Sequence, residues 1–228
     1  MTALAIFVKT PGLSPVKSRL AESVGADLAE QCHLRCARTV AAVAQAAQIG
    51  PVYWAVAEHS ARGHGLWQDL PVLVQPGGGL GARMQAIHNI LVRRHGGGML
   101  IGADLPQVDR SELEKASRWL QGAGERGVIG PARDGGFWLI AANRTLPATV
   151  WRRPDYGTAT VLGAFLDAAG TSLNWRHLAA RTDLDRVEDV AGVIAELQTL
   201  GCPHPDQRGL IDWLKSNFGR PNRNSTTA

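Results

Sequence analysis

The sequence predicts a single-domain α/β fold, a three-layer sandwich in which a mostly parallel sheet carries helices on both faces. Two observations predict it. Short apolar segments of the kind found in buried parallel strands alternate along the chain with longer segments of helical periodicity. Polar or glycine-rich loops follow several of these strands, and in such a sheet these loops collect at one edge. We expect the domain to span residues 1–218 and residues 219–228 to form a disordered tail.

The composition is that of an ordinary globular protein, since the 228 residues are 45% hydrophobic and 19% charged. We expect no membrane span and no signal peptide, because no apolar run is long enough and the N-terminus leads straight into a strand. Three cysteines favour a reducing compartment, so we predict a cytoplasmic protein. The net charge of +4 favours an anionic ligand weakly, and no basic stripe with aromatics indicates nucleic-acid binding.

The first strand is expected at residues 3–8, and residues 9–20 follow as a loop shaped by two prolines and a glycine. Lys17 and Arg19 stand at the end of this loop. A loop after the first strand of an α/β sheet is a natural place to hold phosphates. Lysine supplies a mobile charge and arginine a fork that matches phosphate oxygens. The alternative is a pair of solvated surface cations.

A helix is predicted at residues 26–47, in which Cys32 and Cys36 are expected to be buried small residues, because no second Cys/His cluster completes a metal site. Strands are expected at residues 52–56 and 72–75. Glycines at residues 77–81 then open a helix that reaches about residue 94, on which we expect His88 and His95 to be exposed. These glycines let the backbone approach a ligand closely, although a flexible turn is the alternative.

A fourth strand, residues 99–101, runs into Asp104 and Pro106, and a helix is expected at residues 111–120. Because Pro106 cannot donate a ladder hydrogen bond, strand pairing should stop there. Asp104 would then lie at the edge of the sheet, available to a metal ion or a substrate. A helix cap or a turn is the alternative role for such an aspartate.

The last part of the sheet is predicted from strands at residues 128–131 and 137–140, joined by an Asp-Gly-Gly turn at residues 134–136. This turn forms a plain hairpin or leaves room for a substrate beside Phe137 or Trp138. A helix at residues 158–169 and a strand at residues 172–175 follow.

Asp185 and Glu188 precede the next helix, which ends near residue 200, and a final helix is expected at residues 206–218. The spacing of Asp185 and Glu188 resembles a capping box. The functional alternative makes Asp185 a second carboxylate for a metal ion, in addition to Asp104. A hard divalent cation takes oxygen ligands and also binds phosphate oxygens. Together with basic side chains and glycine backbone, this set suits a nucleoside diphosphate or triphosphate.

The order of these motifs resembles the DUF2064 family, over roughly residues 3–200. That family belongs to the nucleotide-diphospho-sugar transferase superfamily, whose Rossmann-like fold is called glycosyltransferase-A, and some of its members are glycosyltransferases tied to arsenosugar synthesis. The first motif is also similar to phospholactate guanylyltransferases. The motifs are Pro15-Val16-Lys17-Ser18-Arg19-Leu20-Ala21, Leu80-Gly81-Ala82-Arg83-Met84, Ile101-Gly102-Ala103-Asp104-Leu105-Pro106, Gly130-Pro131-Ala132-Arg133-Asp134-Gly135-Gly136-Phe137 and Asp183-Leu184-Asp185-Arg186-Val187-Glu188-Asp189.

The resemblance implies a role for each candidate residue. Asp104 and Asp185 would hold Mg²⁺ or Mn²⁺, and Asp104, Lys17 and Arg19 would act in catalysis. Nucleotide binding falls to Lys9, Thr10, Pro11, Gly12, Lys17, Arg19, Gln75, Leu80, Gly81, Arg83 and Asp104. The acceptor side falls to Asp134, Gly135, Gly136 and Phe137.

Three departures from the superfamily pattern bear on the reaction. Gly102 stands where many glycosyltransferases carry the first aspartate of Asp-x-Asp, and one near plus one distal aspartate is the nucleotidyltransferase arrangement. The first loop nevertheless lacks the Gly-x-Gly-x-Arg signature of nucleotidyltransferases. Arg186 and Val187 replace the usual Thr-Pro of the distal motif.

We therefore expect a metal-dependent glycosyltransferase that moves a sugar from a nucleotide-diphosphate sugar to a small-molecule acceptor. The alternatives are a nucleotidyltransferase that releases pyrophosphate and a non-catalytic nucleotide-binding protein. The nucleobase, the acceptor and the oligomeric state, a homodimer included, stay open. So does the general base, for which His177 and Asp134 are candidates.

Overall fold

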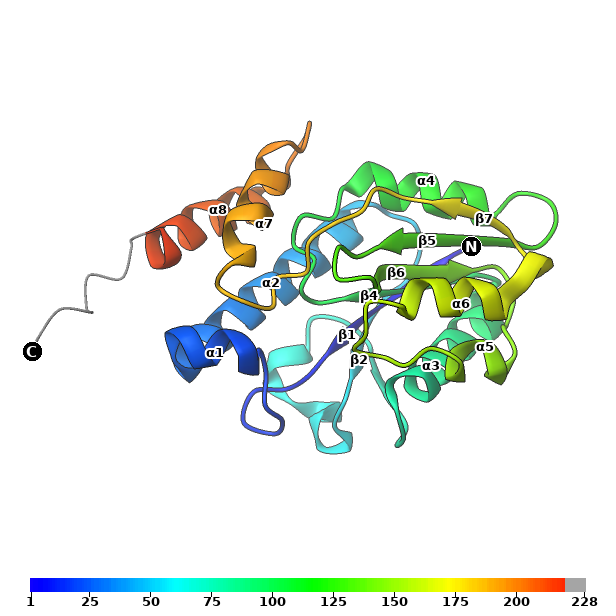
Figure 1. Ribbon diagram of the computed structural model, residues 1–228, viewed down its shortest axis with the longest axis horizontal. Coiled ribbons are helices and arrows are strands. Elements are labelled where there is room, and N and C mark those ends of the chain that lie inside the picture. The colour runs from blue at the N-terminus through cyan, green and yellow to red at the C-terminus, as the bar shows by residue number, and fades with distance from the viewer. Residues whose placement is uncertain (220–228) are drawn as a thin grey trace, which may run out of the picture.

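A sheet of strand order β3-β2-β1-β4-β6-β5-β7 forms the centre of the computed structural model, which describes residues 1–219 (Figure 1). The paired neighbours are parallel except where β6 pairs with β4 and β5. The predicted mostly parallel sheet is therefore confirmed. The strands are β1 Ala3–Val8, β2 Val52–Val56, β3 Val72–Val74, β4 Gly98–Gly102, β5 Arg126–Pro131, β6 Phe137–Ala142 and β7 Asn174–His177.

Helices cover both faces of this sheet, as the sequence predicts. In Figure 1, α2 and α4 lie on one face, and α3, α5 and α6 lie on the other. The remaining helices, α1, α7 and α8, gather around α2 beyond the edge of the sheet. The helices are α1 Ser18–Val24, α2 Ala26–Ala46, α3 Leu80–His95, α4 Arg110–Leu120, α5 Ala148–Arg152, α6 Val161–Ala169, α7 Asp189–Gln198 and α8 Pro205–Phe218, with 3₁₀ turns at His59–Gly63, Gly65–Trp67 and Gly170–Ser172.

The apolar strand β1 is buried on both faces, which explains why it has no polar alternation. Leu4 and Ile6 pack under α2 and α4, whereas Ala3 and Ala5 pack under the helices of the opposite face. A third core cluster joins α1, α2, α7 and α8, and it contains Cys32 and Cys36. The expectation that these cysteines are buried small residues is confirmed, and both are free thiols.

Several element boundaries differ from the sequence-based expectation. Helix α1 was missed because two prolines and a glycine precede it, and it ends at Gly25, whose φ of 86° suits glycine. Helix α5 was missed as well, α6 begins at Val161, three residues later than expected, and β7 begins at Asn174. No helix within residues 1–219 is long and apolar enough to cross a membrane. The tail expected at residues 219–228 lies outside the described residues except for Gly219.

His88 is buried in the core, so the prediction that it is exposed on α3 is wrong. It packs beside Trp151, with ring centroids 5.4 Å apart. Gly98 on β4 leaves room for it, because a Cβ at position 98 would lie 3.3 Å from His88 Cδ2. Burial lowers the pKa of His88 to about 4 from its usual 6.5, since the apolar surroundings disfavour the charged imidazolium.

This burial predicts an acid-sensitive contribution to stability. Between pH 6.5 and pH 4 the unfolded chain binds the proton of His88 more readily than the folded chain, so stability falls as the pH drops through this window. We expect the free energy of unfolding of wild type, relative to His88→Leu, to decrease by about 3 kcal/mol between pH 7 and pH 4. Urea denaturation at a series of pH values measures it.

Leu91→Val is the matched control for this prediction, because Leu91 is buried on the same helix and does not titrate. Its difference from wild type should stay constant with pH. A difference between wild type and His88→Leu that also stays constant would contradict the prediction.

Candidate active site

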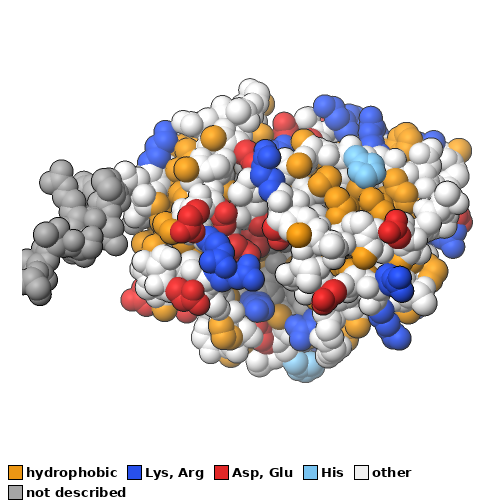
Figure 2. All heavy atoms as spheres, viewed as in Figure 1, with side chains coloured by type: hydrophobic (Ala, Val, Ile, Leu, Met, Phe, Trp, Pro, Cys, Tyr) orange, Lys and Arg blue, Asp and Glu red, His pale blue; other side chains and the backbone are white. Residues whose placement is uncertain are grey.

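A cavity of about 510 Å³ opens at the sheet edge where the parallel strands end. Figure 2 shows acidic and basic side chains gathered around a hollow on this face of the molecule. The volume lies in the range of ligand-binding pockets. The predicted site residues that line it are Lys9, Lys17, Arg19, Gln75, Leu80, Arg83, Asp104, Phe137 and Asp185.

Lys17 joins the two predicted metal ligands. Its Nζ lies 3.1 Å from Oδ2 of Asp104 and 2.8 Å from Oδ1 of Asp185. The lysine side chain is only 6% exposed, whereas Asp104 and Asp185 are 30% and 44% exposed. Lys17 has a left-handed backbone with φ of 46°, immediately before α1. The structure thus brings the three candidate site residues together. The lysine forms an ion pair with each of the two predicted metal ligands.

The segment that carries Asp185 is held directly against the loop that carries Asp104. The backbone N–H of Leu184 donates to the carbonyl of Asp104 at 3.2 Å. The amides of Asp185 and Arg186 donate to the carboxylate of Asp189 at 3.0 and 2.7 Å. The capping box expected from Asp185 is therefore wrong, because Asp189 takes the free amides and leaves Asp185 to face Lys17.

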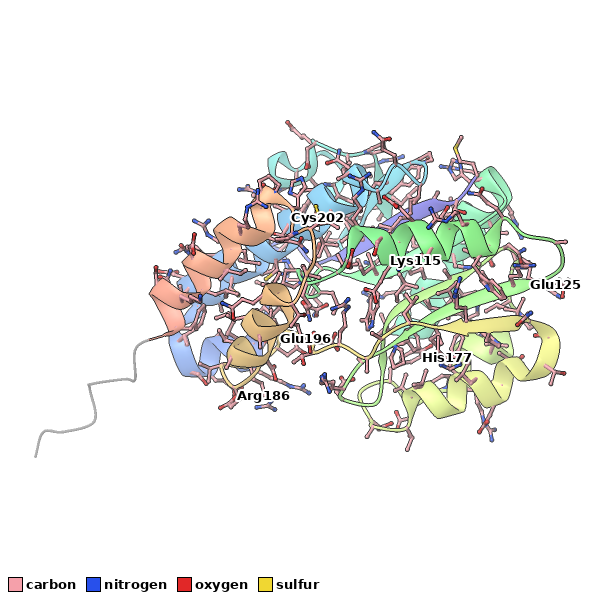
Figure 3. The ribbon with its side chains drawn as sticks, turned by 90° about the horizontal axis from the view of Figure 1, so that it is seen from above. Lys115, Glu125, His177, Arg186, Glu196 and Cys202 are labelled. Atoms are coloured by element: carbon pink, nitrogen blue, oxygen red, sulfur yellow. The ribbon has the colours of Figure 1, made fainter. Side chains whose placement is uncertain are left out.

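Glu196 on α7 ties this segment to the rest of the domain. Its carboxylate accepts hydrogen bonds from Thr182 Oγ1 at 2.8 Å, Gln107 Nε2 at 3.1 Å and Arg133 Nε at 3.3 Å. Figure 3 shows Glu196 on α7 and Arg186 on the loop that precedes it. Burial alone would raise the pKa of Glu196, but these hydrogen bonds outweigh it and lower that pKa. The charged carboxylate thus holds Thr182, Gln107 and Arg133 to helix α7.

A second anchor comes from the C-terminal helix. The buried side chain of Gln207 on α8 donates to the carbonyls of Pro106 and Val108 at 2.8 and 2.9 Å. These carbonyls belong to the loop that follows Asp104. The near aspartate is therefore positioned by β4 on one side and by α8 on the other.

Charge is concentrated around the ion-paired cluster. Burial alone would lower the pKa of Lys17, but Asp104 and Asp185 outweigh it and raise that pKa, so the ammonium stays charged. Burial alone would raise the pKa of Asp185, and the opposing charge of Lys17 outweighs it and lowers that pKa. Asp183 differs: burial, then the negative charges of Asp104, Asp134 and Asp185, raise its pKa to about 8.

Asp183 was not assigned a role from the sequence, although it stands two residues before Asp185. Oδ1 of Asp183 is buried and has no hydrogen-bond partner among the described residues, so this carboxyl is an unpaired polar group beside the cluster. The alternation of two aspartates around a buried leucine, Leu184, is the signal that could have identified it.

The donor set fits a hard cation. Two carboxylate oxygens from distant parts of the chain converge on one point, and a cation, the Lys17 ammonium, occupies that point. Oxygen donors of this kind are those that Mg²⁺ and Mn²⁺ take. Within residues 1–219 no group of three or more His, Cys, Asp or Glu side chains is arranged to hold a metal ion.

The predicted nucleotide-binding residues of the first loop fall into two groups. Lys9 and Arg19 line the cavity, whereas Thr10, Pro11 and Gly12 do not. Thr10 is fully buried, where its hydroxyl accepts a hydrogen bond from Trp67 Nε1 at 3.0 Å. Thr10 therefore has a structural contact that holds the start of the loop to the 3₁₀ turn before β3.

His33 on α2 lines the cavity although the sequence did not indicate it. Its Nε2 lies 2.9 Å from the carbonyl oxygen of Lys9. Burial lowers the pKa of His33, which favours the neutral ring. The residue thus links α2 to the loop after β1, a contact that only the fold reveals.

The predicted acceptor residues form a tight hairpin turn between β5 and β6. The carboxylate of Asp134 accepts a hydrogen bond from the amide of Gly136 at 2.9 Å. Gly135 has φ of 92° and packs against Ala159, where a Cβ would lie 2.1 Å from the carbonyl oxygen. Of this group, Phe137 alone lines the cavity. His177 on β7, labelled in Figure 3, also lies outside the cavity lining, as does Asp134.

Gly81 lies in the first turn of α3, and its α-carbon faces helix α5. A Cβ at this position would lie 2.0 Å from the carbonyl oxygen of Trp151 and 2.7 Å from Cε2 of Tyr156. Gly81 does not line the cavity, although its neighbours Leu80 and Arg83 do. The glycine therefore permits close helix packing.

We expect Gly81→Ala to lower the free energy of unfolding by about 2 kcal/mol, because the added methyl overpacks a rigid backbone contact. Gly163→Ala in α6 is the control, since a Cβ there meets nothing within 4 Å, and it should be neutral or stabilising. Urea denaturation of the two variants measures the difference. Equal free energies of unfolding for Gly81→Ala and Gly163→Ala would show that α5 can shift to accept the methyl group and that the helix packing does not require Gly81.

The solved structures that share the fold include the following three. A "putative nucleotide-diphospho-sugar transferase" from Desulfovibrio desulfuricans G20 is 24% identical and has a TM-score of 0.78, covering 95% of this chain and 97% of its own. A nucleotidyl transferase from Methanothermobacter is 14% identical, with a TM-score of 0.53 and coverage of 87% and 99%. CMP:2-keto-3-deoxy-manno-octonic acid synthetase complexed with CTP is 12% identical, with a TM-score of 0.52 and coverage of 86% and 98%.

No curated protein matches the sequence. The family model described as "Uncharacterized protein conserved in bacteria (DUF2064)" matches residues 25–158, more than half of the chain. The resemblance noted from the motifs and the family match agree, and the fold is that of nucleotide-diphospho-sugar transferases and nucleotidyltransferases. The chain belongs to the DUF2064 family.

Proposed function

We propose that the protein is a metal-dependent transferase that moves a sugar from a nucleotide-diphosphate sugar to a small-molecule acceptor. One observation carries this proposal. The cavity at the ends of the parallel strands contains the Lys17–Asp104–Asp185 cluster and further cations, Lys9, Arg19 and Arg83. Basic groups at this edge of an α/β sheet suit the phosphates of a nucleotide.

The rest of the cavity suits the uncharged parts of such a donor. Its walls are mostly apolar and include Leu80, Met84, Phe137 and Trp138. Leu80 is 47% exposed, unusually so for a large apolar side chain of this protein. A base or a sugar ring that covered it would gain from burial of that surface. Phosphates would then meet the cationic end and the rings the apolar end.

Asp104 and Asp185 would hold Mg²⁺ or Mn²⁺. A bound divalent ion supplies neutralisation of the negative charge that develops on a leaving diphosphate. Arg19 and Lys9 would bind the phosphate oxygens and orient them. The buried edge of the sheet would keep these groups fixed, so that little reorganisation is needed during the reaction.

Nucleotidyl transfer is the second candidate, and Gly102 favours it. Gly102 stands where many glycosyltransferases of this fold carry the first aspartate of Asp-x-Asp, and the space of its missing Cβ is taken by Oδ1 of Asp104. The two-aspartate motif is therefore absent at this position of the chain, which leaves one near aspartate and one distal aspartate for a metal ion. The neighbour that binds CTP would be the model for this reaction, in which a nucleoside triphosphate joins an acceptor and pyrophosphate leaves.

The product separates the two reactions. Thermal-shift assays with nucleoside triphosphates and nucleotide-diphosphate sugars, each with Mn²⁺, would first identify the nucleotide, because a ligand at a hundredfold excess over its Kd stabilises the fold by about 2.7 kcal/mol. ³¹P NMR of the reaction would then detect a nucleoside diphosphate for sugar transfer or pyrophosphate for nucleotidyl transfer. Binding without either product would support a non-catalytic nucleotide-binding protein.

A further inference from the structure

We infer that Lys17 takes the place of the metal ion in the nucleotide-free protein, and that a divalent cation gains Asp104 and Asp185 only when phosphates draw the Lys17 ammonium away. This inference rests on the proposed function, because it concerns how that site acquires its metal and its nucleotide. It assigns to Lys17 a second role, that of a built-in cation which controls metal binding.

The geometry makes the two cations alternatives. The ammonium uses one oxygen of each aspartate, at 3.1 Å for Asp104 and 2.8 Å for Asp185. Oδ1 of Asp104 lies beside Gly102, in the space that a Cβ at that position would take. A divalent ion that bridged the same two carboxylates would lie within a few ångströms of this buried ammonium, and the two cations would repel each other.

The Lys17 ammonium can change partners without a movement of its backbone. Its backbone lies at the junction of the first loop and α1, and its long flexible stem lets the ammonium move while the backbone stays in place. Lys17 lines the same cavity as Lys9 and Arg19. Phosphates bound by those two residues would be close enough to offer the ammonium new partners.

Charge balance couples the two ligands. In the nucleotide-free protein the ammonium opposes the two carboxylates. A nucleotide without a metal ion would draw Lys17 away and leave Asp104 and Asp185 facing the phosphates. A metal ion without a nucleotide would have to displace a paired lysine that has no other anion to contact. Each ligand is therefore expected to bind weakly alone and tightly in the presence of the other.

The test is the affinity of the nucleotide-free protein for Mn²⁺, measured from the electron paramagnetic resonance signal of the free ion. Removal of the competing ammonium in Lys17→Met should raise the affinity about tenfold over wild type. Lys9→Met is the matched control, because it removes an equal charge from the same cavity but, within residues 1–219, Lys9 forms no ion pair with either aspartate. Its Mn²⁺ affinity should stay within about twofold of wild type.

Two further variants test whether the charge of Lys17 causes the difference in Mn²⁺ affinity. Lys17→Arg keeps a cation between the carboxylates and should bind Mn²⁺ as weakly as wild type. Asp104→Asn added to Lys17→Met should abolish the gain. Equal Mn²⁺ affinities for wild type and Lys17→Met, or an equal gain in Lys9→Met, would overturn the inference.

A measurement on the wild type covers the case in which Lys17→Met does not fold. Water-proton relaxation should show no enhancement with Mn²⁺ and protein alone, and a clear enhancement when UDP, CDP, ADP or GDP is added. Strong enhancement with Mn²⁺ and protein alone, or no enhancement with any of the four nucleotides, would overturn the inference that Lys17 gives way to the metal ion when a nucleotide binds. Normal enhancement with no turnover of any substrate would count against the proposed function alone.

Discussion

The Asp104→Asn variant is expected to lose about a thousandfold in kcat/KM, or about 4 kcal/mol of transition-state stabilisation, while keeping its fold. The carboxylate of Asp104 is needed to hold a divalent ion, and a neutral amide is a poor ligand for it. The fold should survive because Asp185 still pairs with Lys17 and the new amide oxygen can still accept from the ammonium.

Steady-state kinetics with the nucleotide identified by thermal shift, together with circular dichroism, would measure this loss. Asp212→Asn is the matched control, since Asp212 is exposed on α8, and it should have wild-type kinetics. A folded Asp104→Asn protein with near-normal kcat/KM would contradict the proposal that Asp104 is a metal ligand.

Lys17→Met is expected to lose a similar factor in kcat/KM, about 10²–10³, because the variant lacks the ammonium that would pass from the two aspartates to the phosphates. The variant should also melt at a lower temperature, since Asp104 and Asp185 would face each other without the buried cation that separates them. The expected loss of activity and the expected gain in Mn²⁺ affinity run in opposite directions, which a merely structural role of Lys17 would not produce.

Lys115→Met provides the comparison for this variant. Lys115 is exposed on α4, as Figure 3 shows, and its removal should leave kcat/KM unchanged. If Lys17→Met had unchanged nucleotide affinity and kcat/KM, Lys17 would have only a structural role as an ion-pair partner.

The sheet could be predicted because its strands are buried on both faces. Leu4, Ala5 and Ile6 have no polar alternation, and such a run is compatible with few environments other than an interior parallel strand. The helix α1 and the burial of His88 could not be predicted in the same way. The first follows two prolines in a short segment, and the second depends on the absence of a side chain at Gly98, on another element.

The candidate site was predicted in part. Asp104 follows the apolar strand β4, and Phe137 begins β6, whose antiparallel direction brings its first residue to the same edge; both line the cavity there. The sequence could not show that Lys17 lies between Asp104 and Asp185, because the pairs span 87 and 168 residues and depend on a left-handed backbone at a lysine. Nor could it show that Gly81 serves helix packing, which depends on Trp151.

The anchoring of the Asp104 loop by Gln207 has a consequence for how the protein is made. During translation β1 and β4 emerge early, and the sheet can begin to form while the last helices are still in the ribosome. The site, by contrast, needs Asp185 and then Gln207, both close to the C-terminal end of the described chain. Contacts between residues so far apart in sequence close slowly. A nascent chain would therefore have a folded sheet before it had an assembled site, so that nucleotide could stabilise the chain only after Gln207 had left the ribosome.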